Sequence, residues 1–329
     1  MPANLPPEYI EAEDRYRNAN SKDEKLDALQ EMLSLLPNHK GTDKIEADLR
    51  KRISDLKKSS QKKKGPTRAK TPDQIEPQGA GQVVLTGLPN SGKSALLDMI
   101  TNASPRVADF PFATHGPTIG MMEHEDVQIQ LIDTPPISDE HVETWVYNLI
   151  RKADLVLLLV DGAEDDPVEA FDRTVELLEQ ENIHLFAPTA DFQQDAIGKT
   201  NRKAQIVITK SDELSSPEAR GKIEESSGIP TTSLSILDED SLSRFSEFVF
   251  DGLNKIRIYT KKPGKEPDLK EPYILDRGST VVEGVRSIHR DMVEKLDYIR
   301  IWGSGRFDGQ EVAQDHVLKD GDIIEIHQK

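Results

Sequence analysis

Apolar positions in the middle of the chain alternate between two patterns. Short, nearly continuous apolar runs, or runs that alternate with polar residues, are typical of strands in a covered sheet. Longer segments with apolar residues three and four apart are typical of helices. The expected strands are 83–85, 127–133, 153–161 and 205–209, and the expected helices are 166–181 and 240–257. Strands that alternate with helices predict an α/β fold with a mostly parallel sheet, whose ligands lie at the carboxyl ends of the strands.

The segments on either side of this region are organised differently. Residues 7–58 show helical spacing, and a polar, basic stretch that contains Pro and Gly follows them. After a second linker-like stretch, short strands surround one expected helix, Val282 to Leu296. We therefore expect a helical region at 1–58, a basic linker at 59–80, a main domain at 81–260, a linker at 261–270 and a last domain at 271–329.

Composition excludes several classes of protein. No run reaches the roughly 18 apolar residues that a membrane span needs, and the N-terminus lacks a signal-peptide pattern. Without cysteine there is no disulfide framework and no thiol nucleophile. The net charge of −17 argues against nucleic-acid binding over the whole surface. We expect a cytoplasmic protein with no membrane partner, and its oligomeric state stays open.

Residues 87–94 read GLPNSGKS and match the phosphate-binding pattern G-x-x-x-x-G-K-S. Glycines let the backbone wrap around phosphates, Lys93 would reach the β- and γ-phosphates, and Ser94 would bind Mg²⁺. The alternative is a glycine-rich turn without a ligand, but a strand before the motif and a helix after it favour phosphate binding. The nucleotide-binding residues expected here are Gly87, Asn90, Ser91, Gly92, Lys93 and Ser94.

Further magnesium ligands are expected downstream of this loop. Asp133 ends a strand, where P-loop proteins place the carboxylate that helps to hold Mg²⁺. Thr114 lies where a switch segment would cross the phosphates, and it is our candidate for a second hydroxyl ligand. Thr118 is the alternative. The predicted metal ligands are therefore Ser94, Thr114 and Asp133.

A second motif predicts which base is bound. Thr209, Lys210 and Asp212 belong to a T-K-x-D box after a buried strand. The Asp212 carboxylate can accept hydrogen bonds from both N1–H and N2–H of guanine, a donor pair that adenine lacks. The Lys210 stem would cover the purine ring, and backbone amides near Ser233 and Leu234 would contact O6. An ATP-dependent kinase or ATPase would require this box to be a coincidence.

Together these segments resemble a known family. The motifs GLPNSGKS, FPFATHGPTIG, LIDTPP and TKSD, with the stretch 272–328, resemble the Obg/developmentally regulated (DRG-like) GTP-binding proteins that carry a C-terminal TGS domain. The resemblance implies a P-loop, Ras-like G domain followed by a ubiquitin-like β-grasp domain. It also implies binding of GTP and GDP, hydrolysis of GTP, and association with the ribosome or ribosomal RNA.

The third nucleotide box departs from the family pattern. It normally reads D-x-x-G, and Pro136 stands at the glycine position without an N–H to offer the γ-phosphate. Ile137 follows where a Ras-like enzyme has glutamine. We therefore expect slow hydrolysis carried by Lys93, Thr114 and Asn90, which in related GTPases helps to bind K⁺. The alternative is a GTP-binding scaffold with little or no hydrolysis.

Basic residues are the expected RNA contacts. One cluster lies in the linker and comprises Lys57, Lys58, Lys62, Lys63, Lys64, Arg68 and Lys70. The candidates in the last domain are Arg286, His289, Arg290, Arg300 and Arg306. The alternatives are an ordinary solvated surface, or a TGS domain that docks a protein partner.

Overall fold

The computed structural model separates the chain into two compact units, residues 1–69 and 70–329. Each unit is described by itself. The residues that the structure describes are 6, 8–9, 12, 15–16, 22–36, 48–53, 71–101, 106–107, 116–140, 142–190, 198–213 and 218–328.

The first unit is built from helical segments around a small apolar core. Its main element is α2 (Lys22–Leu35), and residues 48–53 are also helical. The buried residues of this core are Tyr9, Ala12, Leu29, Met32, Leu49 and Ile53. The basic cluster predicted between Lys57 and Lys70 lies outside the described residues.

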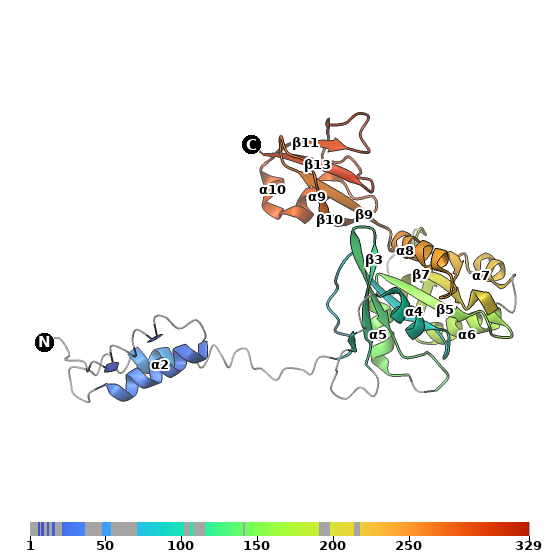
Figure 1. Cartoon of the computed structure of the whole chain (residues 1–329), viewed down its shortest axis with the longest axis horizontal. Coiled ribbons are helices and arrows are strands. Elements are labelled where there is room, and N and C mark those ends of the chain that lie inside the picture. The colour runs from blue at the N-terminus through green and yellow to red at the C-terminus, as the bar shows by residue number, and fades with distance from the viewer. Residues whose placement is uncertain are drawn as a thin grey trace. The chain divides into compact units, whose positions relative to one another are not determined.

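A mostly parallel sheet forms the centre of the second unit (Figure 1). Its strands are β1 (Gln82–Thr86), β2 (Arg106–Val107), β3 (Thr118–His124), β4 (Val127–Asp133), β5 (Leu155–Asp161), β6 (Ile183–Phe186), β7 (Thr200–Thr209) and β8 (Thr231–Ser233). The order is β2-β3-β4-β1-β5-β7-β6, and β8 pairs with β7. Strand β3 pairs antiparallel with β2 and with β4, and the other described strand pairs of this sheet are parallel. The predicted α/β class is confirmed.

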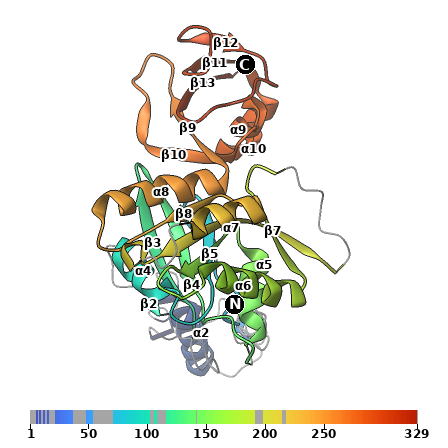
Figure 2. The same ribbon diagram turned by 90° about the vertical axis from the view of Figure 1, so that its right-hand side faces the viewer.

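Helices cover both faces of this sheet (Figure 2). They are α4 (Lys93–Ile100), α5 (Thr144–Lys152), α6 (Pro167–Gln180), α7 (Ala219–Ser227) and α8 (Glu239–Leu253), with a 3₁₀ turn at Ser211–Glu213. Because side chains alternate along a strand, Val84 joins the core beneath α5, α6 and α7, whereas Val83 and Leu85 join the core beneath α4 and α8. None of the described helices is long and apolar enough to cross a bilayer.

Burial on both faces explains the continuous apolar run in the sequence. Every residue of β5 is buried, because helices pack on each side of it. On either side of β5 lie β1 and β7, with which it pairs in parallel. The carboxyl ends of these strands therefore meet at one edge of the sheet, together with the end of β4.

A second, smaller sheet follows in the same unit (Figure 1). Its strands are β9 (Lys255–Lys261), β10 (Asp268–Asp276), β11 (Leu296–Trp302), β12 (Gln310–Val312) and β13 (Asp322–Gln328), in the order β10-β9-β13-β11-β12. The central pair, β9 and β13, is parallel. Ile258, Ile301 and Ile324 pack with Val281 and Val285 of the helical segment α9 (Val281–Ile288). This is the predicted β-grasp arrangement.

Two details differ from the predicted organisation. The residues assigned to a linker at 261–270 include the end of β9 and the start of β10, and the small sheet already begins at Lys255. Its start was hidden because Ile256 and Ile258 directly continue the apolar pattern of α8. The single helix expected from Val282 to Leu296 is two helices, because His289 is extended and caps α10 (Arg290–Glu294).

Candidate nucleotide-binding site

The phosphate-binding loop depends on residues that tolerate positive φ. Gly87 has φ of +149°, and a Cβ atom there would lie 2.3 Å from the carbonyl oxygen of Leu159. Gly92 has φ of +82° at the start of α4. Asn90, at +63°, is a residue type that adopts this left-handed region more readily than most. The local sequence therefore fits the tight turn that connects β1 to α4.

Lys93 extends into the centre of this loop. Its ammonium group donates to the carbonyl oxygens of Gly87 at 3.1 Å and Leu88 at 2.8 Å, and to Ser91 Oγ at 3.0 Å. The side chain is buried, and this desolvation lowers the pKa of Lys93 to about 8, although the nearby Asp133 opposes the shift. A cation is thus held among the peptide groups that would surround the phosphates.

Asp133 and Ser94 meet beside the lysine. Ser94 Oγ donates to Asp133 Oδ2 at 2.6 Å. Burial raises the pKa of Asp133, and the hydrogen bond from Ser94 and the charge of Lys93 oppose that rise. Asp133 Oδ1 is buried with no hydrogen-bond partner among the residues that the structure describes. A buried carboxylate oxygen beside a hydroxyl suits a hard cation such as Mg²⁺, so both residues fit the predicted metal site.

The third predicted metal ligand, Thr114, lies outside the described residues. Thr118, the alternative, begins β3 and lies opposite Asp133 in the antiparallel pairing of β3 with β4. The strand β3 therefore begins beside the residue that carries the carboxylate.

The segment after Asp133 is attached to the phosphate-binding loop. The amide of Ile137 donates to the carbonyl oxygen of Gly87 at 3.1 Å, and its side chain is fully buried in the core beneath α5. Thr134 Oγ1 donates to the carbonyl oxygen of Leu85 at 2.8 Å. Pro136 is exposed. The residue at the glutamine position therefore faces the protein core, where it cannot orient a water molecule.

A cavity of about 320 Å³ lies beside the loop and holds the predicted base-reading residues. Lys210 and Asp212 line it, together with Gly92 and Leu234. Thr209 Oγ1 donates to the carbonyl oxygen of Ser91 at 3.1 Å, which ties the T-K-x-D box to the phosphate-binding loop. The fold thus joins two motifs that are 118 residues apart.

The predicted contact of Leu234 with the base needs correction. Its amide donates to the carbonyl oxygen of Ile208 at 2.8 Å, so the sheet already uses this N–H. Ser233 belongs to β8, opposite Ile208, and does not line the cavity. Of these two residues, only Leu234 lines the cavity.

Two polar residues that bind side chains of this pocket were not predicted. Ser235 Oγ donates to Asp212 Oδ1 at 2.5 Å, and this bond lowers the pKa of Asp212. Asp161 Oδ2 accepts from Lys210 Nζ at 2.5 Å. Asp161 ends an apolar strand as Asp133 does, so the same signal could have identified it. No pattern in the sequence marked Ser235.

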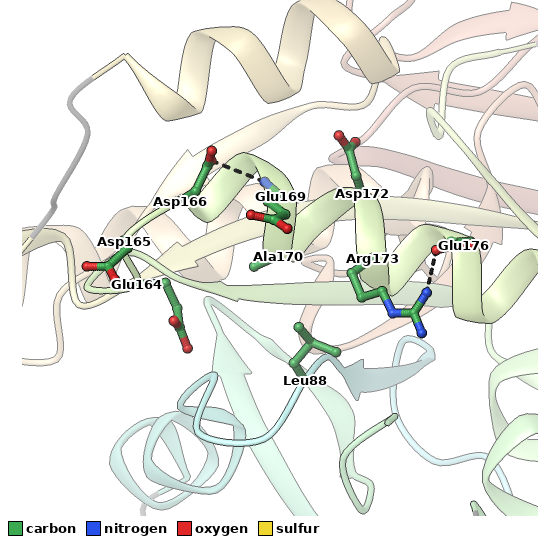
Figure 3. Close-up of a pocket in the computed structure, with 9 residues that line it drawn as sticks. All are labelled: Leu88, Glu164, Asp165, Asp166, Glu169, Ala170, Asp172, Arg173 and Glu176. Atoms are coloured by element: carbon green, nitrogen blue, oxygen red, sulfur yellow. Dashed lines mark hydrogen bonds and ion pairs between the residues drawn. The ribbon is translucent and has the colours of Figure 1, made fainter. Parts of the chain in front are cut away.

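A larger cavity of about 780 Å³ is lined by Leu88 of the loop and by residues at and before α6 (Figure 3). The segment before α6 and the first turns of that helix supply six carboxylates to its lining: Glu164, Asp165, Asp166, Glu169, Asp172 and Glu176. Arg173 is the one cation among the lining residues, and it pairs with Glu176 and with Asp139. Such an acidic lining repels phosphates, so they are expected at the loop instead.

The basic residues predicted in the small domain are all exposed. They lie on α9, α10, β11 and the connecting segments: Arg286, His289, Arg290, Arg300 and Arg306. Exposure leaves them available to a phosphate backbone, and it is also what an ordinary solvated surface shows.

Comparison with known families identifies two domains. Residues 82–188 match the family described as 50S ribosome-binding GTPase, and residues 256–328 match the TGS domain. An uncharacterized GTP-binding protein of Methanocaldococcus jannaschii is 26% identical over 92% of this chain and 92% of its own length. The developmentally-regulated GTP-binding protein 2 homolog of Dictyostelium discoideum is 26% identical over 76% of this chain and 84% of its own length.

The fold has a relative among solved structures. The YchF GTPase of Schizosaccharomyces pombe superposes with a TM-score of 0.52 over 77% of this chain and 99% of that chain, at 13% identity. The named relatives support the DRG-like label more closely than the broader Obg label. The chain thus contains a GTPase domain followed by a TGS domain, and it is similar over most of its length to the developmentally regulated (DRG-like) GTP-binding proteins, as its motifs predicted.

Proposed function

We propose that this protein binds GTP and GDP with Mg²⁺ in the cytoplasm and hydrolyses GTP slowly. The observation that carries the proposal is the joining of three motifs at one sheet edge. Lys93 lies in the phosphate-binding loop, the Ser94–Asp133 pair lies beside it, and Thr209 ties the base-reading box to the same loop. Each motif alone is a weaker signal than their common location.

Each part of the site has a distinct task in this proposal. Backbone amides between Gly87 and Ser94 surround the phosphates, and the N-terminus of α4 adds favourable potential for anions. Lys93 neutralises phosphate charge. Asp212 accepts the two guanine donors, and the aliphatic stem of Lys210 covers one face of the ring.

Ser94 and Asp133 are the residues that would hold Mg²⁺, together with Thr114 from the predicted switch segment. The ion would neutralise charge on the β- and γ-phosphates. Asn90 is the candidate for a K⁺ contact. Its side chain comes from the phosphate-binding loop itself, where a monovalent cation could take the place of an arginine finger.

Catalysis would rest on position and electrostatics. Phosphoryl transfer needs little covalent help from the protein, so Lys93 and the metal site would supply most of the stabilisation. The buried side chain of Ile137 orients no water. Slow turnover is therefore expected.

Single-turnover hydrolysis of GTP tests this proposal. The full chain with Mg²⁺ should cleave GTP faster than protein-free buffer, and Lys93→Ala should abolish the difference. Replacing K⁺ by Na⁺ at constant ionic strength should slow the reaction if Asn90 helps to hold K⁺. Equal rates in both salts would remove the K⁺ proposal and leave the hydrolysis proposal intact.

The second candidate is a GTP-binding scaffold without useful hydrolysis. It is favoured by Pro136, which removes an amide from the third box, and by the amide of Ile137, which bonds to Gly87. Cleavage no faster than in buffer, measured with ribosomes present and nucleotide binding intact, would favour the scaffold.

We also propose that the protein acts on or with the ribosome or its RNA. Support comes from the ribosome-binding description of the matched GTPase family and from the exposed basic residues. Neutralising several phosphates makes binding fall steeply with salt. Ribosome co-sedimentation should therefore be lost at high salt and reduced when Lys62, Lys63 and Lys64 are changed to alanine.

A matched control is the same change at three exposed lysines elsewhere, Lys222, Lys262 and Lys265. Ribosome co-sedimentation that is unchanged by salt and by the three linker substitutions would argue against electrostatic contact with RNA. It would favour the alternative in which the TGS domain docks a protein.

A further inference from the structure

Asp161 is a buried carboxylate at the nucleotide site to which the proposed function gives no task. It is the last residue of β5, and only 9% of its side chain is exposed. It lies opposite Thr209 in the parallel pairing of β5 with β7. Charged side chains are seldom buried this far without a specific partner.

The Asp161 carboxylate is held in a fixed orientation. Its Oδ1 atom accepts a hydrogen bond from the amide of Ala163 at 2.9 Å. The intervening amide of Gly162 donates to the carbonyl oxygen of Thr209 at 2.9 Å, which fixes the turn after β5. Because the backbone holds one oxygen, the other is a stationary acceptor.

That second oxygen binds the lysine of the base-reading box. Asp161 Oδ2 accepts from Lys210 Nζ at 2.5 Å. The Lys210 backbone is also fixed, since it has φ of +51° directly after the strand end. The four-carbon stem therefore runs between two fixed points, and it lines the cavity that also contains Asp212.

We infer that Asp161 is a positioning residue for nucleotide binding, which holds the Lys210 stem as a preformed wall for the purine ring. The inference rests on the proposed function, in which this cavity receives the guanine base. A free lysine side chain loses considerable rotamer freedom when it is ordered. An anchored lysine has already lost that freedom before the nucleotide arrives, so the affinity is higher.

This mechanism has a recognisable signature. The Lys210 stem would contact the face of the purine ring, which guanine and hypoxanthine share. Loss of the Asp161 carboxylate should therefore weaken the binding of GDP and of IDP by the same factor. A defect at Asp212 should instead penalise GDP more, because only guanine has the N2–H donors. The sign is also informative, since removing a negative charge near phosphates would by itself strengthen binding.

The experiment measures dissociation constants of GDP and IDP for the full chain with Mg²⁺. Asp161→Asn keeps an acceptor for Ala163 and removes the charge, Lys210→Met keeps the stem and removes the ammonium group, and the third variant combines them. Asp165→Asn removes an exposed carboxylate of the acidic cavity and is the charge-matched control (Figure 3). Thermal melting without nucleotide reports on the fold.

We expect Asp161→Asn to weaken both nucleotides by roughly twofold to tenfold, the range for ordering one long side chain. It should cause no further loss in the Lys210→Met background, and Asp165→Asn should not weaken binding. The inference would be overturned if Asp161→Asn lowered the affinity equally in the wild-type and Lys210→Met backgrounds. A change in the ratio of the GDP and IDP dissociation constants would also overturn it. So would an unaltered affinity of Asp161→Asn in a wild-type protein that binds GDP.

Failure of the wild-type chain to bind GDP would instead refute the proposed function. If Asp161→Asn does not fold, Lys210→Met decides the question. It must then weaken GDP and IDP by a common factor, and unchanged affinities would reject the positioning of the stem.

Discussion

The amide of Ile137 donates to the carbonyl oxygen of Gly87 across 3.1 Å, and this bond attaches the third nucleotide box to the first. Pro136, the residue before it, has no N–H. Neither of the two positions therefore offers a free amide in the described arrangement. The protein should therefore bind GTP and GDP with similar affinities.

Restoring the amide should restore a preference for GTP over GDP. We predict that Pro136→Gly raises the affinity for a non-hydrolysable GTP analogue, relative to GDP, by about tenfold, because a hydrogen bond to a charged group becomes available. Fluorescence titration of both nucleotides measures the ratio. Ser138→Gly adds similar flexibility without a new amide and should leave the ratio unchanged. The same rise in both variants would point to flexibility alone.

Nucleotide affinity should depend on pH through Lys93. Burial lowers its pKa to about 8 from 10.5, and phosphate binding requires the charged form. Affinity should be nearly constant below that pKa and fall by up to about tenfold per pH unit above it. Isothermal titration across this range measures the slope. Lys93→Arg, which stays charged, should bind with a flatter profile, and a flat wild-type profile would contradict the prediction.

The same shift has a consequence for stability. Because the folded pKa lies below the unfolded value, burial of the charged lysine destabilises the nucleotide-free fold below about pH 8. The penalty disappears as the pH rises toward 10.5. Denaturant unfolding of wild type and Lys93→Met should therefore give stabilities that converge as the pH rises through this interval.

Gly87 should tolerate no side chain. A Cβ atom there meets a backbone oxygen at 2.3 Å, so we predict that Gly87→Ala costs about 2–4 kcal/mol and abolishes nucleotide binding. Gly228 ends α7 with positive φ, and a Cβ atom there would have no neighbour within 4 Å. Gly228→Ala should cost about 1–2 kcal/mol and leave binding intact. If urea unfolding shows the same loss of stability for both variants, the close approach at Gly87 does not add to the cost of the substitution.

Ser235 should support recognition of the guanine edge. Ser235→Ala removes the hydrogen bond that orients Asp212, and we predict that GDP affinity falls by about threefold to tenfold. IDP should lose less, because it lacks the N2–H donors. Ser243→Ala, on the exposed side of α8, is the control. If the affinities for GDP and IDP fall by the same factor, Ser235 has only a structural role.

Asp133 should couple nucleotide retention to Mg²⁺. Chelation of the metal should speed GDP release from wild type, because the Asp133 Oδ1 atom is placed to contact a cation. Asp133→Asn keeps an acceptor for the Ser94 hydroxyl but lacks the charge, so its release rate should no longer respond to chelation. Stopped-flow release of a fluorescent GDP measures both rates. An intact response in the variant would exclude Asp133 from the metal site.

Some differences between sequence and structure have local physical causes. The start of the small sheet at Lys255 was not predicted, because the buried Ile256 and Ile258 continue the apolar pattern of the preceding helix, α8. The expected helix from Val282 is interrupted because the His289 side chain accepts a hydrogen bond from the amide of Asp291 and caps the start of a new helix. Neither cause is visible as a change in periodicity.

The sequence by itself determined the α/β class, the phosphate-binding loop, the strand-end Asp133 and the base-reading box. These features depend on residue types at short spacings, which set local backbone conformation and chemistry. Only the tertiary structure decided that Asp161 anchors Lys210, that Ser235 orients Asp212 and that the amide of Ile137 is bound to Gly87. Such contacts join residues 23 to 50 positions apart, and the pairing of strands, which no local pattern encodes, brings them within hydrogen-bonding distance.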